Sequence, residues 1–203
     1  MKVAIVGATG NAGSCLVKEL VSRGHDVTAI ARHADKAAGP NVTVKSLDAS
    51  DGEALSAALR GHDAVISALR FIDTDAAALI TAVKRSGVKR YAVVGGAASL
   101  YAPGTTMRLF DGPDFPDMFK PEAGGGLRFL DLLKQESELD WVFLSPSMMF
   151  VGTERTGKFR LGKDELLVAA DGNSSISFPD FAIALVDELE TPKHHRERFT
   201  VGY

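Results

Sequence analysis

Short apolar runs alternate with amphipathic segments along the first half of the chain. The runs are rich in β-branched residues, are apolar on both strand faces, and cover residues 3–6, 27–30, 42–44, 64–66 and 91–94. The segments between them repeat apolar residues at a helical spacing and cover residues 11–23, 50–60 and 75–86. This alternation is typical of a parallel sheet that helices cover on both faces. It predicts an α/β protein with a Rossmann-like, doubly wound parallel sheet.

Polar residues and glycines mark where these helices begin and end. Ser50 to Glu53 has the spacing of a capping box, which predicts that a helix starts there. Gly24 and Gly87 follow the first and third helical segments, where a glycine commonly ends a helix.

The second half of the chain is less regular. Residues 97–121 contain four prolines and little periodicity, and connections of this length are often functional. The pattern predicts a helix at 122–137, a strand at 141–144, a helix at 179–190 and a last strand at 199–201, with 166–168 as a weaker candidate strand. His194 and His195 lie in the connection before the last strand, which we expect to be solvated and not metal-binding.

Size, charge and cysteine content limit the possible functions. A chain of 203 residues forms one domain, or one domain with a small lobe. A net charge of −3 without a basic stripe argues against nucleic acid as a partner. The single cysteine leaves no internal disulfide, and no stretch resembles a signal peptide or a membrane span. We therefore expect a cytoplasmic protein, monomeric or homodimeric, with no membrane partner.

Three glycines directly after the first apolar run carry the strongest chemical signal. Gly7 allows a tight turn, Gly10 lets the backbone approach a pyrophosphate, and Gly13 lets the next helix pack closely on the sheet. The spacing is G-x-x-G-x-x-G, and its place between a strand and a helix favours a dinucleotide over another nucleotide or a plain turn. We expect cofactor contacts from Gly7, Thr9, Gly10, Asn11, Ala12 and Gly13.

The end of the second strand distinguishes the two nicotinamide cofactors. NAD sites usually place an acid here to bind the ribose hydroxyls, but this strand ends in Arg32 and His33, and Asp35 comes too late. Arg32 stays charged at any working pH and can pair with a 2′-phosphate, although a solvent-facing arginine would have the same sequence. The sequence favours NADPH over NADH, with Arg32 and His33 as cofactor-binding residues.

With these motifs, the chain resembles the atypical short-chain dehydrogenase/reductase superfamily. More narrowly, it is similar to a group of NADH-flavin reductases related to biliverdin reductase B and the NmrA-like proteins. The segments that carry the resemblance are GATGNAG (7–13), LDASD (47–51), ISAL (66–69), VVGGAASLY (93–101), DWVFLSPSMMF (140–150), ERTGKFRLGKDELL (154–167) and ISFPDFAIALVDELETP (176–192). The glycine motif is common to the superfamily, whereas segment 154–167 points to the narrower group.

The resemblance implies cofactor contacts at the C-terminal ends of the strands, where open α/β sheets bind ligands. The implied contacts are Asp48 beside the adenine, Ser67, Ala68 and Leu69 along the adenosine and pyrophosphate, Gly95 and Gly96 near the nicotinamide ribose, and Pro146 and Ser147 near the nicotinamide. Asp48 and Ser67 would also suit turn caps. We expect one NAD(P)-binding domain over 1–203, in which 97–121 and 147–178 form substrate-side loops of a small C-terminal substrate lobe.

A catalytic pair common in this superfamily is missing. Most of its reductases use a Tyr-x-x-x-Lys pair, in which the lysine lowers the tyrosine pKa for proton donation to a carbonyl oxygen. Here Tyr91 and Tyr101 are followed four positions later by glycine and threonine. Tyr203 ends the sequence, so no lysine follows it within residues 1–203. Ketone reduction leaves a basic alkoxide that needs a positioned acid, whereas a reduced flavin or quinone is a delocalised anion that water can protonate.

Two irregular stretches hold the candidate substrate residues. Ser99 follows the fifth strand, where a serine commonly bonds a substrate oxygen, although a loop-capping role fits equally. Arg155 heads a cluster of cations between 155 and 163 that would attract a flavin phosphate or simply lie on a solvated hairpin.

Apolar and small residues near the long loop suggest a cover over a ring system. Phe110 is one of several large apolar residues in loop 97–121, as in a lid over a ring or a loop packed on the core or on a second subunit. Three glycines at 124–126 would leave room for a flat ligand or mark a mobile lid.

The sequence thus predicts hydride transfer from NADPH to FMN, FAD, a quinone or a similar conjugated small molecule. The alternative is a non-catalytic, NAD(P)-binding redox sensor of the NmrA type. An isomerase or epimerase is less favoured, because it usually needs the tyrosine as well.

Overall fold

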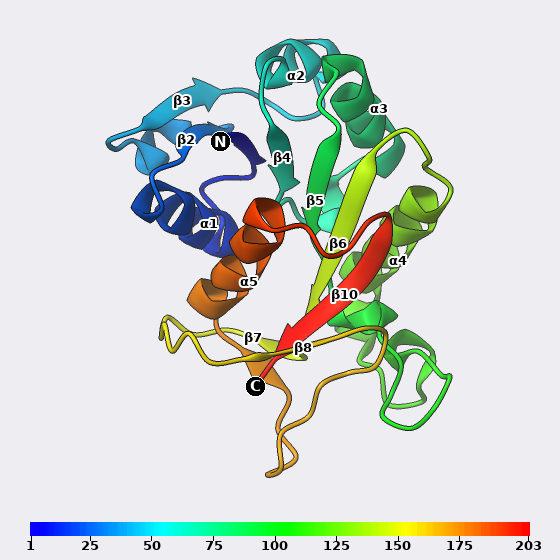
Figure 1. Cartoon of the computed structure of the whole chain (residues 1–203). Coiled ribbons are helices and arrows are strands. Elements are labelled where there is room, and N and C mark those ends of the chain that lie inside the picture. The colour runs from blue at the N-terminus through cyan, green and yellow to red at the C-terminus, as the bar shows by residue number, and fades with distance from the viewer.

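An eight-stranded sheet runs through the computed structural model, which describes residues 1–203 (Figure 1). Its strands are β1 (Lys2–Val6), β2 (Asp26–Ala31), β3 (Val42–Ser46), β4 (Ala64–Ser67), β5 (Arg90–Val94), β6 (Asp140–Pro146), β8 (Arg160–Gly162) and β10 (Glu197–Gly202). The order is β3-β2-β1-β4-β5-β6-β10-β8, and only β8 is antiparallel to its neighbour. The order reverses direction between β1 and β4, where doubly wound sheets bind nucleotides.

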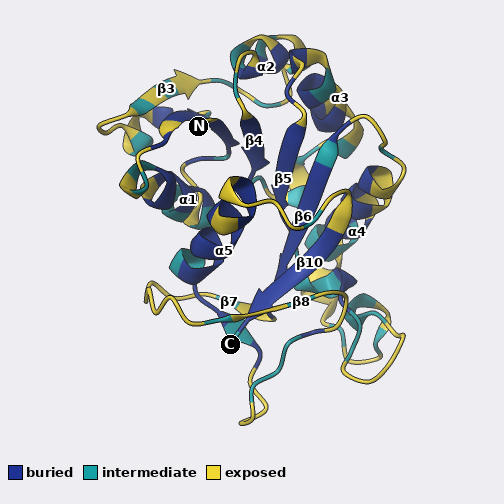
Figure 2. Ribbon diagram, in the orientation of Figure 1, coloured by how far each residue is buried: buried dark blue, intermediate teal, exposed yellow.

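Helices cover both faces of this sheet, as the sequence pattern predicts. Helices α1 (Asn11–Ser22) and α5 (Phe178–Glu190) pack on one face, and α2 (Gly52–Leu59), α3 (Ala76–Ser86) and α4 (Lys120–Lys134) pack on the other. Val3 and Ile5 point into the first core, whereas Ala4 and Val6 point into the second. The central strands are apolar on both faces because both faces are buried (Figure 2).

Helix ends follow the sequence signals with one shift. Gly24 and Gly87 take positive φ angles of 79° and 83° directly after their helices, as expected. Helix α2 is capped by Asp51, whose carboxylate accepts a hydrogen bond from the Ala54 amide, and not by Ser50. The Ser50 hydroxyl instead donates to Asp48 at 2.9 Å.

The second half departs from the prediction in three places. Helix α4 starts at Lys120 with Pro121 in its first turn, so the preceding loop ends at 119. The strand expected at 166–168 is wrong, because the Leu166 amide bonds the Tyr101 carbonyl outside any sheet. A separate two-stranded sheet joins β7 (Met149–Phe150) to β9 (Ser175–Ile176).

The histidine connection is also more structured than expected. The ring of His194 stacks on Phe199 with centroids 4.1 Å apart, and its Nδ1 bonds Glu188 at 2.8 Å. His195 is exposed and bonds Asp140. The expectation of a solvated loop is therefore wrong for His194, and no group of three or more His, Cys, Asp or Glu side chains is placed to hold a metal ion.

The two long loops meet at one end of the sheet (Figure 1). The first contains the 3-10 turns η3 (Ala97–Ser99), η4 (Leu109–Asp111) and η5 (Asp117–Phe119). A bridge between Tyr101 and Glu165 and a 2.8 Å bond from the Gly104 amide to the Glu165 carboxylate tie this loop to the second one. Two further 3-10 turns are η1 (Ala34–Ala37) and η2 (Phe71–Asp73). None of the five α-helices combines the length and hydropathy needed to cross a bilayer.

Candidate functional site

The turn between β1 and α1 needs two of its glycines for internal packing. Gly7 has φ +90°, and a Cβ atom there would lie 2.6 Å from the Ala68 carbonyl oxygen. A Cβ atom at Gly13 would lie 2.1 Å from the Gly7 carbonyl oxygen, so only glycine lets α1 pack this close to the turn. At Gly10 a Cβ atom would meet no atom closer than 3.5 Å. Gly10 thus leaves its surroundings open for a ligand.

Backbone amides at the start of α1 have no partner within the chain. The N–H groups without an acceptor are those of Thr9, Asn11, Ala12 and Gly13. No side chain caps this helix, and its first turn holds no acidic residue. Free amides and the positive end of the helix dipole together suit a phosphate group.

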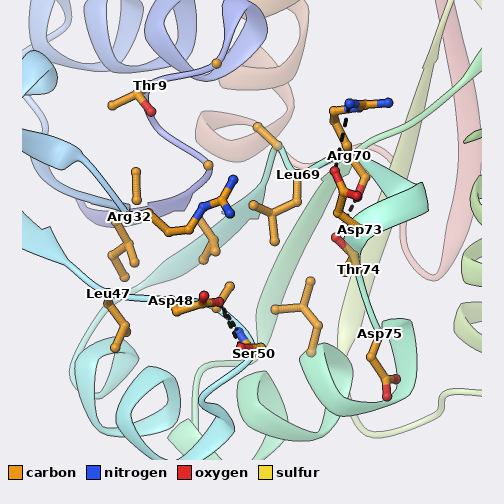
Figure 3. A pocket seen from close by; sticks show the side chains of 18 of the residues that line it. Thr9, Arg32, Leu47, Asp48, Ser50, Leu69, Arg70, Asp73, Thr74 and Asp75 are labelled. Atoms are coloured by element: carbon orange, nitrogen blue, oxygen red, sulfur yellow. Dashed lines mark hydrogen bonds and ion pairs between the residues drawn. The ribbon is translucent and has the colours of Figure 1, made fainter.

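A cavity of about 590 Å³ opens beside this turn, over the C-terminal ends of β1, β2 and β4. Figure 3 shows the side chains that line it. The predicted residues that line this cavity are Gly7, Thr9, Gly10, Arg32, His33, Asp48, Ala68 and Leu69. Asn11, Ala12, Gly13 and Ser67 do not line it, although the first three lie in the adjoining turn of α1. The cavity therefore brings together residues from four segments that are distant in sequence.

Arg32 and Asp48, the two charged side chains predicted to contact the cofactor, differ in whether they already make hydrogen bonds. Arg32 is exposed at the end of β2 and makes no hydrogen bond or ion pair, and Figure 3 shows it extending over the cavity. Asp48 accepts hydrogen bonds from the amide and hydroxyl of Ser50, and these bonds lower the pKa of its carboxyl below the ordinary value. Arg32 is free to bind an added anion, whereas Asp48 is partly engaged.

A second cavity, of about 690 Å³, lies over the ends of β5 and β6. The predicted residues that line it are Gly95, Gly96, Ser99, Pro146 and Ser147. The Ser147 hydroxyl is buried and donates to the Val201 carbonyl at 3.1 Å, so it is already engaged. Leu69 lines the first cavity and Phe71 the second, so the segment after β4 links the two.

The Ser99 hydroxyl is held by Arg198, which is itself paired with Asp164. This hydroxyl accepts a 3.1 Å hydrogen bond from Arg198 of β10 and donates a longer, 3.3 Å bond to the Gly96 carbonyl. Arg198 is itself held by the carboxylate of Asp164 at 2.8 Å. Since the donated bond is long, the Ser99 proton can turn toward the cavity.

Two predicted substrate residues lie outside both cavities. Arg155 forms an ion pair with Glu19 of α1, at 3.0 Å, and lines neither cavity. The ring of Phe110 packs against Phe115 with centroids 5.3 Å apart, and Phe115 is the one that lines the second cavity.

Two glycines of α4, Gly125 and Gly126, make room for the Phe71 side chain, and Gly126 also lines the second cavity. A Cβ atom at Gly125 would lie 2.9 Å from the Cβ of Phe71, and one at Gly126 would lie 3.0 Å from its ring. Phe71 also stacks on Phe143 of β6, with centroids 6.0 Å apart. The Glu122 carboxylate of α4 accepts hydrogen bonds from the Phe71 and Ile72 amides, each at 2.9 Å. These contacts fix η2 against α4.

Sequence reasoning missed Phe71 and the methionines of the second cavity. Phe71, Met107, Met148 and Met149 all line this cavity. Their signal is that large apolar residues stand in segments with no strand or helix to bury them. Such residues lie at ligand pockets or interfaces as well as in small secondary cores, so the sequence pattern alone does not show which of these environments they occupy.

No tyrosine is placed as a general acid in the manner of the Tyr-x-x-x-Lys enzymes. Burial raises the pKa of Tyr91 well above its ordinary value, and its side chain is fully enclosed. The Tyr203 hydroxyl donates to Asp180 at 2.8 Å, away from both cavities.

Comparisons with known proteins agree with this geometry. Residues 7–192 match a family of NAD(P)H-binding proteins. The protein YwnB of Bacillus subtilis (strain 168) is 40% identical over 210 residues, which cover 99% of this chain and 98% of YwnB.

Solved structures share both sequence and fold with this chain. A proposed epimerase from Bacteroides thetaiotaomicron is 42% identical with a TM-score of 0.93, covering 100% of this chain and 96% of that one. A proposed NADH-flavin reductase from Streptococcus pneumoniae TIGR4 is 39% identical with a TM-score of 0.89, covering 100% of this chain and 99% of that one.

Proposed function

This chain belongs to the NAD(P)H-binding family, and we propose that it is an NADPH-dependent reductase of a planar conjugated acceptor, a quinone or a flavin. The observation that carries this proposal is the presence of two cavities at the C-terminal edge of the sheet, with Leu69 in the lining of the first and Phe71 in that of the second. The first combines a phosphate-binding turn with an unpaired arginine, and the second is largely apolar. This combination suits a dinucleotide whose nicotinamide end faces a second, ring-shaped molecule.

The residues present fit NADPH. The free amides from Thr9 to Gly13 would hold the pyrophosphate, and Arg32 would pair with the 2′-phosphate. Gly95 and Gly96 would lie near the nicotinamide ribose, where a Cβ atom at Gly95 would already clash with Phe143. When bound, NADPH supplies a hydride, and a proton from water completes the reduction of a quinone to a hydroquinone as NADP⁺ forms.

The chain contributes positioning more than acid catalysis. Ser99 can donate a hydrogen bond to an acceptor oxygen in exchange for its long, 3.3 Å bond to Gly96, whereas the other hydroxyl of the second cavity, that of Ser147, holds a shorter, 3.1 Å bond to Val201. A delocalised quinone or flavin anion needs no strong acid, and holding the donor and acceptor face to face lowers the barrier by itself. This requirement agrees with the absence of the Tyr-x-x-x-Lys pair.

A redox sensor that binds NADPH without turnover is the second candidate, and the buried Tyr91 and the missing pair favour it. An epimerase, as proposed for the relative from Bacteroides thetaiotaomicron, is less compatible, because it too usually depends on a tyrosine acid or base.

Loss of NADPH absorbance after mixing the purified protein with NADPH and FMN, FAD or a simple quinone tests the proposal. We expect a saturable, protein-dependent loss that is faster with NADPH than with NADH. Binding of NADPH, seen by its fluorescence, without loss for any of these acceptors would instead support the sensor.

A further inference from the structure

We infer that the acceptor is an uncharged quinone-type ring, and that flavins bearing a phosphate are poor substrates. This inference rests on the proposed function and names the substrate class of its second cavity. It follows from the charged side chains that line this cavity and from the position of the cations at 155–163 outside it.

The second cavity offers no unpaired cation. Arg108 is the only basic residue in its lining, and its guanidinium is already held by the Asp111 carboxylate at 2.6 and 3.2 Å. A phosphate entering this cavity would have to displace that ion pair.

The carboxylates of the cavity oppose an anion as well. Glu122 is engaged by two backbone amides of η2, but Asp114 makes no hydrogen bond or ion pair and lies exposed at the rim. Its charge would repel a phosphate or sulfonate, since a like charge without compensation disfavours binding.

The cations within loop 147–178 do not line the second cavity. Arg155 is paired with Glu19 of α1, and Arg160 donates to the carbonyls of Val168 and Tyr203. Lys158 and Lys163 do not line either cavity. The cation cluster at 155–163, which would attract a flavin phosphate, therefore supplies no charge to this cavity.

Apolar side chains surround the opening instead. Met107, Phe119, Met148 and Met149 line the cavity and remain 45 to 60% exposed. Methionine is flexible and polarizable, so these side chains can adjust to the faces and edges of flat rings. A volume of about 690 Å³ is ample for a nicotinamide and a fused-ring acceptor together. The Ser99 hydroxyl provides one polar contact for an acceptor carbonyl.

Two matched pairs of acceptors test the charge preference: 1,4-naphthoquinone against 1,4-naphthoquinone-2-sulfonate, and riboflavin against FMN. Their dissociation constants are measured by calorimetry on the full chain saturated with NADP⁺, and kcat/KM is measured with NADPH. We expect each uncharged ring to bind at least about tenfold more tightly than its anionic partner. Equal or tighter binding of FMN or the sulfonate, or no binding by either uncharged ring, would overturn the inference.

Substitution at the rim identifies the source of the preference. Asp114→Asn should reduce the ratio between the dissociation constants of the anionic and the uncharged acceptors about three- to fivefold, as expected for one exposed charge. Asp117→Asn removes a carboxylate from the same loop outside the cavity, where it pairs with Lys120, and should leave this ratio unchanged. Binding selectivity without any turnover would refute the reductase and keep the inference about the cavity. Turnover of FMN as efficient as that of riboflavin would refute the inference and keep the reductase.

Discussion

The guanidinium of Arg198 donates a 3.1 Å hydrogen bond to the hydroxyl of Ser99, a residue that lines the second cavity. Both residues are buried, and 99 positions separate them in the sequence. Because Arg198 occupies one lone pair, the serine is set to act as a donor toward the cavity and not as a base. Ser99 is thus suited to hold an acceptor oxygen in place.

This role predicts a small effect when the hydroxyl is removed. Ser99→Ala should lower kcat/KM for a quinone by less than about tenfold, whereas loss of a true general acid costs about 10²- to 10⁴-fold. Steady-state kinetics with NADPH measures the difference, and Ser22→Ala, which removes a hydroxyl outside both cavities, is the control. A loss of a thousandfold or more would assign Ser99 to proton transfer.

Cofactor preference is predicted to depend on Arg32. Arg32→Ala should weaken NADPH binding by about ten- to a hundredfold, because a charged hydrogen bond contributes about 1.5–3 kcal/mol. NADH, which lacks the 2′-phosphate, should bind almost unchanged. Fluorescence titration measures both constants, with Lys36→Ala as a control that removes one nearby exposed charge outside the cavity. An equal loss for the two cofactors would contradict the assignment.

The first half of the fold and the glycine turn between β1 and α1 could be predicted because their signals are local. Each central strand is apolar on both faces, and Gly7, Gly24 and Gly87 have positive φ angles that explain why glycine stands there. These features belong to single segments, so periodicity and turn chemistry reveal them.

Beyond the predicted residues at the ends of β5 and β6, the lining of the second cavity could not be predicted, because it depends on contacts between distant segments. Nothing near residue 155 indicates that Arg155 pairs with Glu19, and nothing near Gly126 indicates that Phe71 packs there. Strand β8 has only three residues, two of them exposed, so it gives no alternating pattern. Tertiary packing decides these features.

The close approach of α4 to Phe71 predicts opposite effects for neighbouring glycines. Gly125→Ala would place a Cβ atom 2.9 to 3.0 Å from Phe71, including its backbone, and such overpacking costs about 1–3 kcal/mol of unfolding free energy. Gly124→Ala meets no atom closer than the flexible end of Arg128 at 3.4 Å and should stabilise the helix by about 0.5–1 kcal/mol. Urea unfolding of both variants measures the contrast, and equal stability would refute the packing argument.

A buried carboxylate at the opposite edge of the sheet predicts how stability depends on pH. Glu188 is buried, bonds Arg90 at 2.7 Å and His194 at 2.8 Å, and accepts two backbone amides. Burial by itself would raise the pKa of Glu188, but the hydrogen bonds from His194 and Lys193 outweigh it and hold the pKa below its ordinary value of 4.5.

A carboxyl whose pKa is lowered by folding stabilises the protein above its ordinary pKa and loses this contribution as the pH falls through the folded value. Glu188→Gln should therefore lower the unfolding free energy at pH 7 by about 1.5–3 kcal/mol, because it removes the 2.7 Å charged hydrogen bond to Arg90, which keeps only Asp140, at 3.1 Å, as a carboxylate partner. The difference from the unmodified chain should shrink as the pH falls below 4.5. Urea unfolding from pH 7 to pH 3 measures it, and the exposed, unpaired Glu197 provides the control variant Glu197→Gln. A difference that stays constant across this range would show that the Glu188 charge contributes nothing to stability.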